Sequence, residues 1–241
     1  MPAMEALFST SAPFVVPSEV DFFSIIVGVV TGALCGCGRK LDIVGCIVAG
    51  LLTAYGGGII RDLLLQDEGI YFMDNPGVVL ICIALAAFVF YFRGWFARLD
   101  RSLFVLDAFS VALFALAGAN KAFQCGEGVV MVVLLGAITS VGGGALRDVC
   151  TGVVPSVFRS SNYYAVAGVA GSVAFAALAF AGVPLIVAAV ACVAVVVALR
   201  CLSVRYGWTT AAEADYYPYV SRGARKVRDA AKGLIDRHRP S

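Results

Sequence analysis

The stretch TAYGGGIIRD at residues 53–62 returns as TSVGGGALRD at residues 139–148, 86 positions later. Further matches share this offset without any insertion: Asp21 with Asp107, and Gly32-Ala33 with Gly118-Ala119. So many matches in one register indicate that the chain contains two copies of one unit. Each copy places three glycines and an Arg-Asp pair inside apolar sequence, where glycine weakens a helix and a charge is costly.

The composition is that of a protein embedded in a lipid bilayer. Hydrophobic residues make up 61% of the 241 residues and charged residues only 14%, whereas soluble domains carry roughly 25% charged residues. Residues 160–199 contain no charged side chain, and Gly182-Val183-Pro184 near their middle predicts a hairpin between two helices. The period-two alternation of an outer-membrane barrel is missing, so the sequence predicts an all-α membrane protein.

Seven apolar segments are predicted to span the membrane as helices. They lie at 22–38, 43–65, 76–92, 104–122, 128–150, 162–180 and 184–203. Each copy of the unit holds three of them, and since three is odd, the copies are predicted to cross the membrane in opposite directions. The predicted parts are an extracellular N-terminal segment at 1–20, a three-helix repeat at 21–103, a second, inverted three-helix repeat at 104–182, a seventh helix at 183–204 and a basic cytoplasmic tail at 205–241.

The basic residues give the expected orientation. In the seven-span arrangement nearly all of them fall on one side: Arg39, Lys40, Arg93, Arg98, Arg101, Arg159, Arg200, Arg205 and those of the tail. By the positive-inside rule the amino terminus is expected outside and the carboxyl terminus in the cytoplasm. The first twenty residues contain no Lys or Arg, so a cleaved signal peptide is not expected and the first span is predicted to act as the targeting signal.

The glycine triplets fall late in the second and fifth predicted helices. They are Gly56, Gly57 and Gly58 in the first copy and Gly142, Gly143 and Gly144 in the second. Three glycines weaken a helix by roughly 2–3 kcal/mol relative to alanine, so helices 2 and 5 are predicted to break there. Carbonyls freed at a hydrated cavity suit a dehydrating cation. The alternative is that the glycines only allow close helix packing; their repetition in both copies favours a pathway.

The Arg-Asp pairs are candidate pore or gate charges: Arg61, Asp62, Arg147 and Asp148. We predict one ion pair inside each unit, bracing the broken helix against the first helix of the same unit. The predicted pairs are Asp21 with Arg61 and Asp107 with Arg147. The alternative is that the arginines reach the interface and the aspartates cap helix starts. Lys121, at the outer end of the fourth span, is either an interfacial anchor or a residue of the pore mouth.

The inventory of reactive side chains predicts no enzyme, no cofactor and no metal site. Almost all of the eight cysteines lie within apolar spans, where they act as small packing residues, and none forms a Cys-x-x-Cys pair. His238, the only histidine, lies in the polar tail. No phosphate-binding loop, serine nucleophile elbow or zinc-binding helix is present in the sequence.

The segment 205–241 carries eight basic and four acidic residues. Its aromatic and basic residues suit either a short helix on the anionic inner leaflet or a solvated tail. Nucleic acid is not expected as a partner, because the topology already explains the positive charge.

Two Gly-Gly-Gly-x-x-Arg-Asp motifs, at 56–62 and 142–148, and a seventh span resemble the prokaryotic trimeric intracellular cation (TRIC) channels over about 21–204. The same repeat is also catalogued as a bacterial glycine-transporter domain. The resemblance implies a homotrimer in an inner, plasma membrane. It implies a potassium-preferring pore in each subunit, lined by glycine-broken helices 2 and 5, with Arg61 and Arg147 in the pore or its gate. The lysine-containing motif of the animal channels is missing at 142–148, so their lipid-binding and calcium-linked regulation is not implied.

Two functions therefore stay open for this chain. The first is a passive channel for monovalent cations such as potassium. The second is a secondary transporter of glycine or another small zwitterion. Both use broken helices at the interface of two repeats, and they differ in whether both gates can open together.

Overall fold

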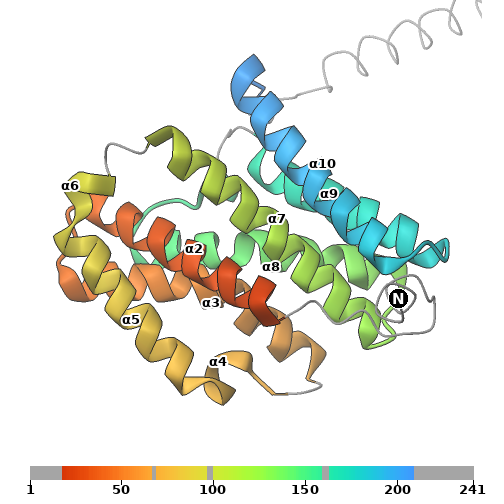
Figure 1. Ribbon diagram of the computed structural model, residues 1–241, viewed down its shortest axis with the longest axis horizontal. Coiled ribbons are helices and arrows are strands. Elements are labelled where there is room, and N and C mark those ends of the chain that lie inside the picture. The colour runs from red at the N-terminus through yellow and green to blue at the C-terminus, as the bar shows by residue number, and fades with distance from the viewer. Residues whose placement is uncertain (1–17, 67–68, 97–99, 159–162, 209–241) are drawn as a thin grey trace, which may run out of the picture. The chain divides into compact units, whose positions relative to one another are not determined.

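The computed structural model describes residues 18–66, 69–96, 100–158 and 163–208, and every regular element in these ranges is a helix (Figure 1). The helices are α2 Ser18–Gly38, α3 Ile43–Leu65, α4 Tyr71–Asp74, α5 Pro76–Tyr91, α6 Arg93–Phe96, α7 Asp100–Gln124, α8 Val129–Cys150, the 3₁₀ turn η2 Ser156–Phe158, α9 Tyr164–Phe180 and α10 Leu185–Tyr206. The prediction of an all-helical protein is confirmed. Most of the predicted N-terminal segment and of the tail lies outside the described residues.

Seven of these helices coincide with the seven predicted spans. Four described helices are long and apolar enough to cross a membrane: α3, the part of α7 from Phe104, α8 and α10. The apolar parts of α2, α5 and α9 are shorter. At 1.5 Å per residue, the 16 residues of α5 reach about 24 Å, less than the ~30 Å of a hydrocarbon core. The hairpin predicted at Gly182 is present, because α9 ends at Phe180 and Gly182 has a φ of +75°.

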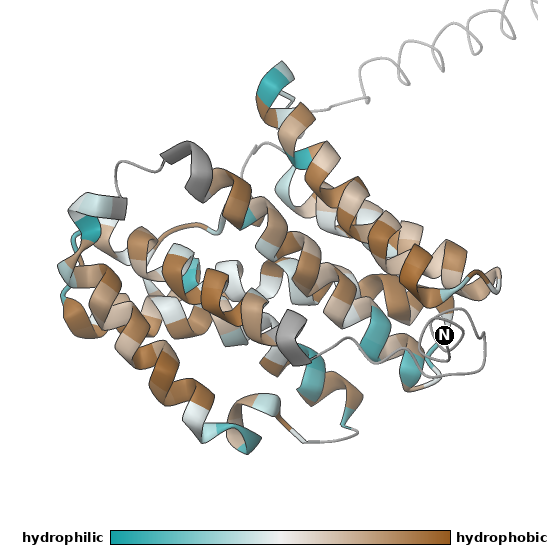
Figure 2. Cartoon of the chain, viewed as in Figure 1, coloured by the Kyte–Doolittle hydropathy of each residue, from teal (hydrophilic) through white to brown (hydrophobic). Residues whose placement is uncertain are grey.

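Apolar side chains cover the outside of the helices as well as the core. Figure 2 shows hydrophobic residues along most of the length of the long helices. Val130 is 77% exposed and Leu80 67% exposed, on α8 and α5 respectively. Contiguous exposed apolar surface of this kind is unfavourable in water, so these faces require lipid or a protein partner.

The two repeats pack in the same way. In the first, α2 packs against α3, and α5 covers both; in the second, α7 packs against α8, and α9 covers both. The register of 86 residues extends to the third helix of each repeat. A Cβ added to Gly50 would meet the Val29 carbonyl and Ala86, whereas one added to Gly136 would meet the equivalent Ala115 carbonyl and Ser172. Residues that are equivalent in the two repeats by sequence therefore also make equivalent contacts.

The central contact joins α3 to α8, with α5 and the α9–α10 pair on opposite flanks (Figure 1). A Cβ on Gly57 would strike the Thr139 carbonyl, and a Cβ on Gly143 would strike the Thr53 carbonyl. Since position 57 meets 139 while 53 meets 143, the two helices run in opposite directions at their contact. Equivalent helices related in this antiparallel way are what an inverted repeat requires.

The seventh long helix, α10, has no counterpart in the first repeat and packs against α7 and α9. The Arg200 guanidinium donates to Asp107 Oδ2 at 2.8 Å. Its central carbon also lies 5.0 Å from the Phe104 ring centroid and 4.8 Å from that of Tyr164. Arg200 is only 6% exposed. Its side chain therefore links α10 to both α7 and α9 from a buried position.

Replacing Arg200 by Met is expected to lower the free energy of unfolding by about 2–3 kcal/mol, because it removes a partly buried ion pair and two ring contacts. Thermal unfolding of the purified chain in detergent measures the effect. Arg205→Met, at an exposed position on the same helix, is the matched control and should leave the unfolding temperature unchanged. Equal stability of the two variants would contradict a stabilising role for the Arg200 contacts with α7 and α9.

Candidate functional site

The first two glycines of each triplet form the contact between α3 and α8. A Cβ on Gly56 would lie 3.0 Å from the Gly143 Cα, and one on Gly142 would lie 3.2 Å from the Gly57 Cα. Gly57 and Gly143 are tighter still, since each faces a threonine carbonyl at under 3.0 Å. Only glycine permits two helix backbones to approach so closely.

The predicted breaks at the triplets are wrong, because α3 runs uninterrupted over Ile43–Leu65 and α8 over Val129–Cys150. The physical reason is the contact itself. The close approach of two backbones supplies dispersion contacts that offset the low helix propensity of glycine. Close packing, the alternative reading of the glycines, therefore accounts for Gly56, Gly57, Gly142 and Gly143.

The third glycine of each triplet has a different environment. A Cβ on Gly58 would meet nothing closer than the Arg61 guanidinium at 3.9 Å. A Cβ on Gly144 would meet Tyr164 Oη at 3.5 Å and the Arg147 guanidinium at 3.9 Å. Each third glycine thus lies beside the arginine three residues later on the same helix face. Both distances are ordinary van der Waals separations, so neither third glycine is required by close packing.

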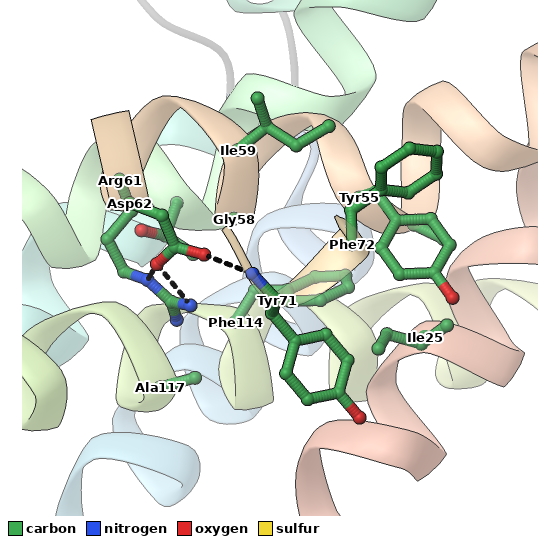
Figure 3. A pocket seen from close by; sticks show the side chains of 12 residues that line it. Ile25, Tyr55, Gly58, Ile59, Arg61, Asp62, Tyr71, Phe72, Phe114 and Ala117 are labelled. Carbon is green, nitrogen blue, oxygen red and sulfur yellow. Dashed lines mark hydrogen bonds and ion pairs between the residues drawn. The ribbon is translucent and has the colours of Figure 1, made fainter. Parts of the chain in front are cut away.

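Asp62 is the centre of one charged cluster (Figure 3). Nε and a terminal nitrogen of Arg61 both lie 2.8 Å from Asp62 Oδ1. Lys121 Nζ lies 3.2 Å from the same oxygen. The main-chain N–H of Tyr71 donates to Oδ2 at 3.2 Å. The Asp62 side chain is 1% exposed, so its charge is compensated by protein groups and little by solvent.

Asp148 is the centre of a second cluster with the same plan. Arg147 donates to Asp148 Oδ1 at 3.0 and 2.8 Å. Arg39 donates to the same oxygen at 2.7 Å and also to the Thr151 hydroxyl. The main-chain N–H of Ser156 donates to Oδ2 at 3.0 Å. Each aspartate thus binds its own arginine, the N–H of the following segment, and a base from the other repeat.

The two cross-repeat bases are not equivalent in sequence. Lys121 lies near the end of α7 and Arg39 just after α2, but in the 86-residue register Lys121 corresponds to Cys35 and Arg39 to Cys125. The two positions differ by four residues, about one helical turn. The two clusters therefore have the same geometry, although their cross-repeat bases do not occupy equivalent positions in the two repeats. Aligning the repeats could not reveal these partners. The predicted seven spans do put each base on the same side as its aspartate, but this alone does not identify the partner.

Of the two ion pairs predicted inside the units, only the one in the second unit lies within the described side chains, and it is replaced by two others. In the second unit, Asp107 binds Arg200 and Arg147 binds Asp148, so the predicted Asp107–Arg147 pair is wrong. In the first unit, Arg61 binds Asp62, and the side chain of Asp21 lies outside the described residues. The physical reason is proximity: an aspartate next in sequence on the same helix reaches the arginine at no cost in chain closure.

Each cluster carries a positive excess, since two bases surround one carboxylate. Lys121, with its side chain 21% exposed, and Arg39, with 26%, are the more accessible bases. Arg61 is 9% exposed and Arg147 15%. Removing an accessible base would leave one arginine paired with one aspartate and no net charge.

A pocket lies beside the Asp62 cluster, between α2, α3 and α4 of the first repeat and α7 and α8 of the second. It contains about 400 Å³ of space not filled by atoms, part of which is open. Four aromatic side chains are among the twelve residues that line it, and the Arg61–Asp62 pair lies at one end (Figure 3). The lining residues that matter here are Tyr55, Gly58, Arg61, Asp62, Tyr71, Phe72, Phe114 and Thr139. Gly58 therefore faces space, unlike the two glycines before it.

The pocket differs between the two repeats. Tyr55 corresponds to Val141 in the 86-residue register, and Phe114 corresponds to Gly28. The aromatic residues at these two positions therefore have no aromatic counterparts at the equivalent positions, 141 and 28, of the other repeat. Within the described ranges, no group of three His, Cys, Asp or Glu side chains is arranged to hold a metal ion.

Both repeats match one known protein family. The family model described as "Glycine transporter" matches residues 19–94 and again residues 104–180. The inner membrane protein YadS of Escherichia coli K12 is 30% identical over 188 residues, which cover 78% of this chain and 91% of YadS.

Two solved structures share the fold. The trimeric intracellular cation channel orthologue from Rhodobacter sphaeroides is 35% identical, with a TM-score of 0.73, over 79% of this chain and 98% of that one. A TRIC cation channel from a study of conductance is 28% identical, with a TM-score of 0.77, over 83% of this chain and 98% of that one. Almost the whole of each solved chain therefore has a counterpart here.

Proposed function

Because this chain belongs to the glycine-transporter family and has the fold of the trimeric intracellular cation channels, we propose that it conducts monovalent cations passively, with a preference for potassium. The observation that carries the proposal is structural. Nearly all of two solved cation channels superimposes on this chain, and the superposition includes both repeats and most of the described helices.

The proposed membrane arrangement has seven spans, with the repeats at 21–103 and 104–182, the seventh helix at 183–204, and the amino terminus outside. The ion pairs support it. Lys121 and Asp62 both belong to the outer side of this arrangement, whereas Arg39 and Asp148 both belong to the inner side. YadS, a relative, is an inner membrane protein, and we propose the same location here, as a homotrimer.

The proposed pathway passes along α3 and α8 beside their third glycines, between the two charged clusters. The pocket at Gly58 is its outer part. In the described conformation two bases neutralise each carboxylate, and the positive excess repels a cation. Each cluster then acts as a gate. Withdrawal of Lys121 from Asp62, or of Arg39 from Asp148, removes a positive charge from the pathway and exposes an oxygen that a cation can use as a ligand.

Replacing Lys121 or Arg39 by Met is expected to increase potassium flux several-fold. Loss of one charge near a partly hydrated ion lowers its barrier by about 1 kcal/mol, and 1.4 kcal/mol is tenfold in rate. Potassium efflux from liposomes of equal protein content measures this. Lys40→Met changes the exposed base next to Arg39 and should leave the flux unaltered. A loss of flux in the Lys121 and Arg39 variants would mean that these bases support permeation, contrary to the gate.

Purified chain in liposomes tests the function itself. Potassium efflux down its gradient, sustained with no other solute, is the expected result. Saturable uptake of labelled glycine without potassium efflux would instead identify the chain as a transporter of a small zwitterion, the alternative consistent with the family's description. Cross-linking in the same liposomes should yield a trimer.

A further inference from the structure

Two cysteine sulfurs lie close together where α2 passes into α3. Cys37 Sγ and Cys46 Sγ are 3.5 Å apart. Cys37 is in the last turn of α2 and Cys46 in the first turns of α3. Cys46 is fully buried, while Cys37 is partly exposed. Cys37 is therefore the more accessible residue of the two, and the sulfur of Cys46 lies next to its sulfur.

The turn between the helices holds the two sulfurs in place. A Cβ on Gly36 would lie 3.1 Å from the Cys46 Cα, so glycine at this position lets α3 approach the end of α2. The Leu41 N–H donates to the Gly36 carbonyl at 3.1 Å, and Asp42 caps α3 by accepting from the Gly45 N–H at 2.7 Å. Both ends of the turn are therefore fixed by hydrogen bonds.

The hydrogen bonding at sulfur gives the two thiols different roles. Cys46 donates its S–H to the Leu41 carbonyl at 3.7 Å, which leaves its sulfur to accept from Cys37. The more exposed thiol is the one that an oxidant reaches first, and a neighbouring thiol resolves the product into a disulfide. A disulfide has an S–S length of about 2.05 Å, so the two sulfurs, 3.5 Å apart, need to approach each other by about 1.5 Å.

We propose that Cys37 and Cys46 are a redox modification site, which a peroxide converts into an intramolecular disulfide. The Cys37 thiolate attacks hydrogen peroxide and becomes a sulfenic acid, with release of hydroxide. The Cys46 thiol then displaces water from that sulfenic acid and forms the S–S bond. Two thiols are oxidised, one peroxide is reduced to two waters, and a thiol reductant reverses the reaction.

The disulfide also affects the charged cluster centred on Asp148. This consequence rests on the proposed function. Arg39 follows Cys37 by two residues in the same turn and donates to Asp148 and Thr151. A disulfide fixes this turn to α3 and so keeps Arg39 at Asp148. Oxidation is therefore expected to slow potassium efflux, and reduction to restore it. In the proposed orientation the turn faces the reducing cytoplasm, where the bond forms only during oxidative stress.

Peptide mapping tests the modification on the full chain in liposomes. The chain is treated with hydrogen peroxide, blocked with N-ethylmaleimide, digested and analysed by mass spectrometry. The expected product is a cross-linked peptide pair containing Cys37 and Cys46, lighter by two hydrogen atoms and separated by dithiothreitol. Cys37→Ser and Cys46→Ser should each abolish it, whereas Cys150→Ser and Cys201→Ser, at exposed positions, should not. Recovery of both thiols as maleimide adducts after oxidation of the wild-type chain would overturn the proposal.

Potassium efflux from the same oxidised liposomes tests the second consequence. A disulfide that forms without slowing efflux would refute the link to Arg39 and leave the modification standing. Absence of efflux before oxidation would instead count against the channel, while peptide mapping would still decide whether the disulfide forms.

Discussion

Gly57→Ala and Gly143→Ala are each expected to destabilise the fold by about 3 kcal/mol or more, at or above the upper end of ordinary overpacking costs. The added methyl group would lie closer than 3.0 Å to a main-chain oxygen, of Thr139 in one case and of Thr53 in the other. A backbone cannot rotate away as a side chain can, so α3 and α8 must separate. Because both halves depend on this contact, purified protein should unfold at a much lower temperature or fail to accumulate.

Gly58→Ala is the matched control for this prediction. It lies in the same triplet, but its Cβ would meet only the Arg61 guanidinium, at 3.9 Å. Alanine is the better helix former by about 1 kcal/mol, so this variant should be as stable as the wild type or more stable. If Gly57→Ala proved as stable as Gly58→Ala, the helix crossing would not be tight. A stable Gly58→Ala protein without potassium flux would indicate that α3 must bend at the triplet during conduction.

Asp62→Asn and Asp148→Asn are each expected to lower the free energy of unfolding by about 3–5 kcal/mol, the usual cost of removing one partner from a buried ion pair. Each substitution leaves two bases without their carboxylate, among them an arginine that is at most 15% exposed. The main-chain N–H that donates a hydrogen bond to the carboxylate is left with an uncharged and therefore weaker acceptor, the asparagine side chain. Thermal unfolding in detergent measures the loss, and Asp74→Asn, at an exposed position, is the control.

A double-mutant cycle separates the pair from the rest of the cluster. Arg39→Met combined with Asp148→Asn should cost less than the sum of the single changes, because the cross-repeat base and its carboxylate are removed together. Strictly additive effects would contradict the contact between Arg39 and Asp148.

The helices and the repeat could be predicted from the sequence because their signals are local. Apolar segments of sufficient length mark the helices, and a fixed offset of 86 residues marks the duplication. The hairpin at Gly182 is likewise present, since a glycine and a proline interrupt an otherwise uncharged segment. Each of these features can be recognised from the order of residues alone, without knowing which residues meet in space.

The glycine triplets and the ion pairs could not be predicted in the same way, because they depend on contacts across the molecule. Helix propensity favours a break at Gly57, but the backbone of α8 lies against it and the helix continues. The partner of Asp62 across the repeats is Lys121, 59 residues away, and that of Asp148 is Arg39, 109 residues away. The partner of Asp107 lies on the seventh helix, which the duplication does not include.

Recording currents from the purified chain in planar lipid bilayers tests the central claim most directly. With unequal potassium chloride concentrations on the two sides, the account predicts unitary current steps that reverse near the potassium equilibrium potential, and larger currents in the Lys121→Met and Arg39→Met variants. The absence of current steps in bilayers that contain folded protein would contradict it, if the same protein in liposomes shows saturable uptake of labelled glycine.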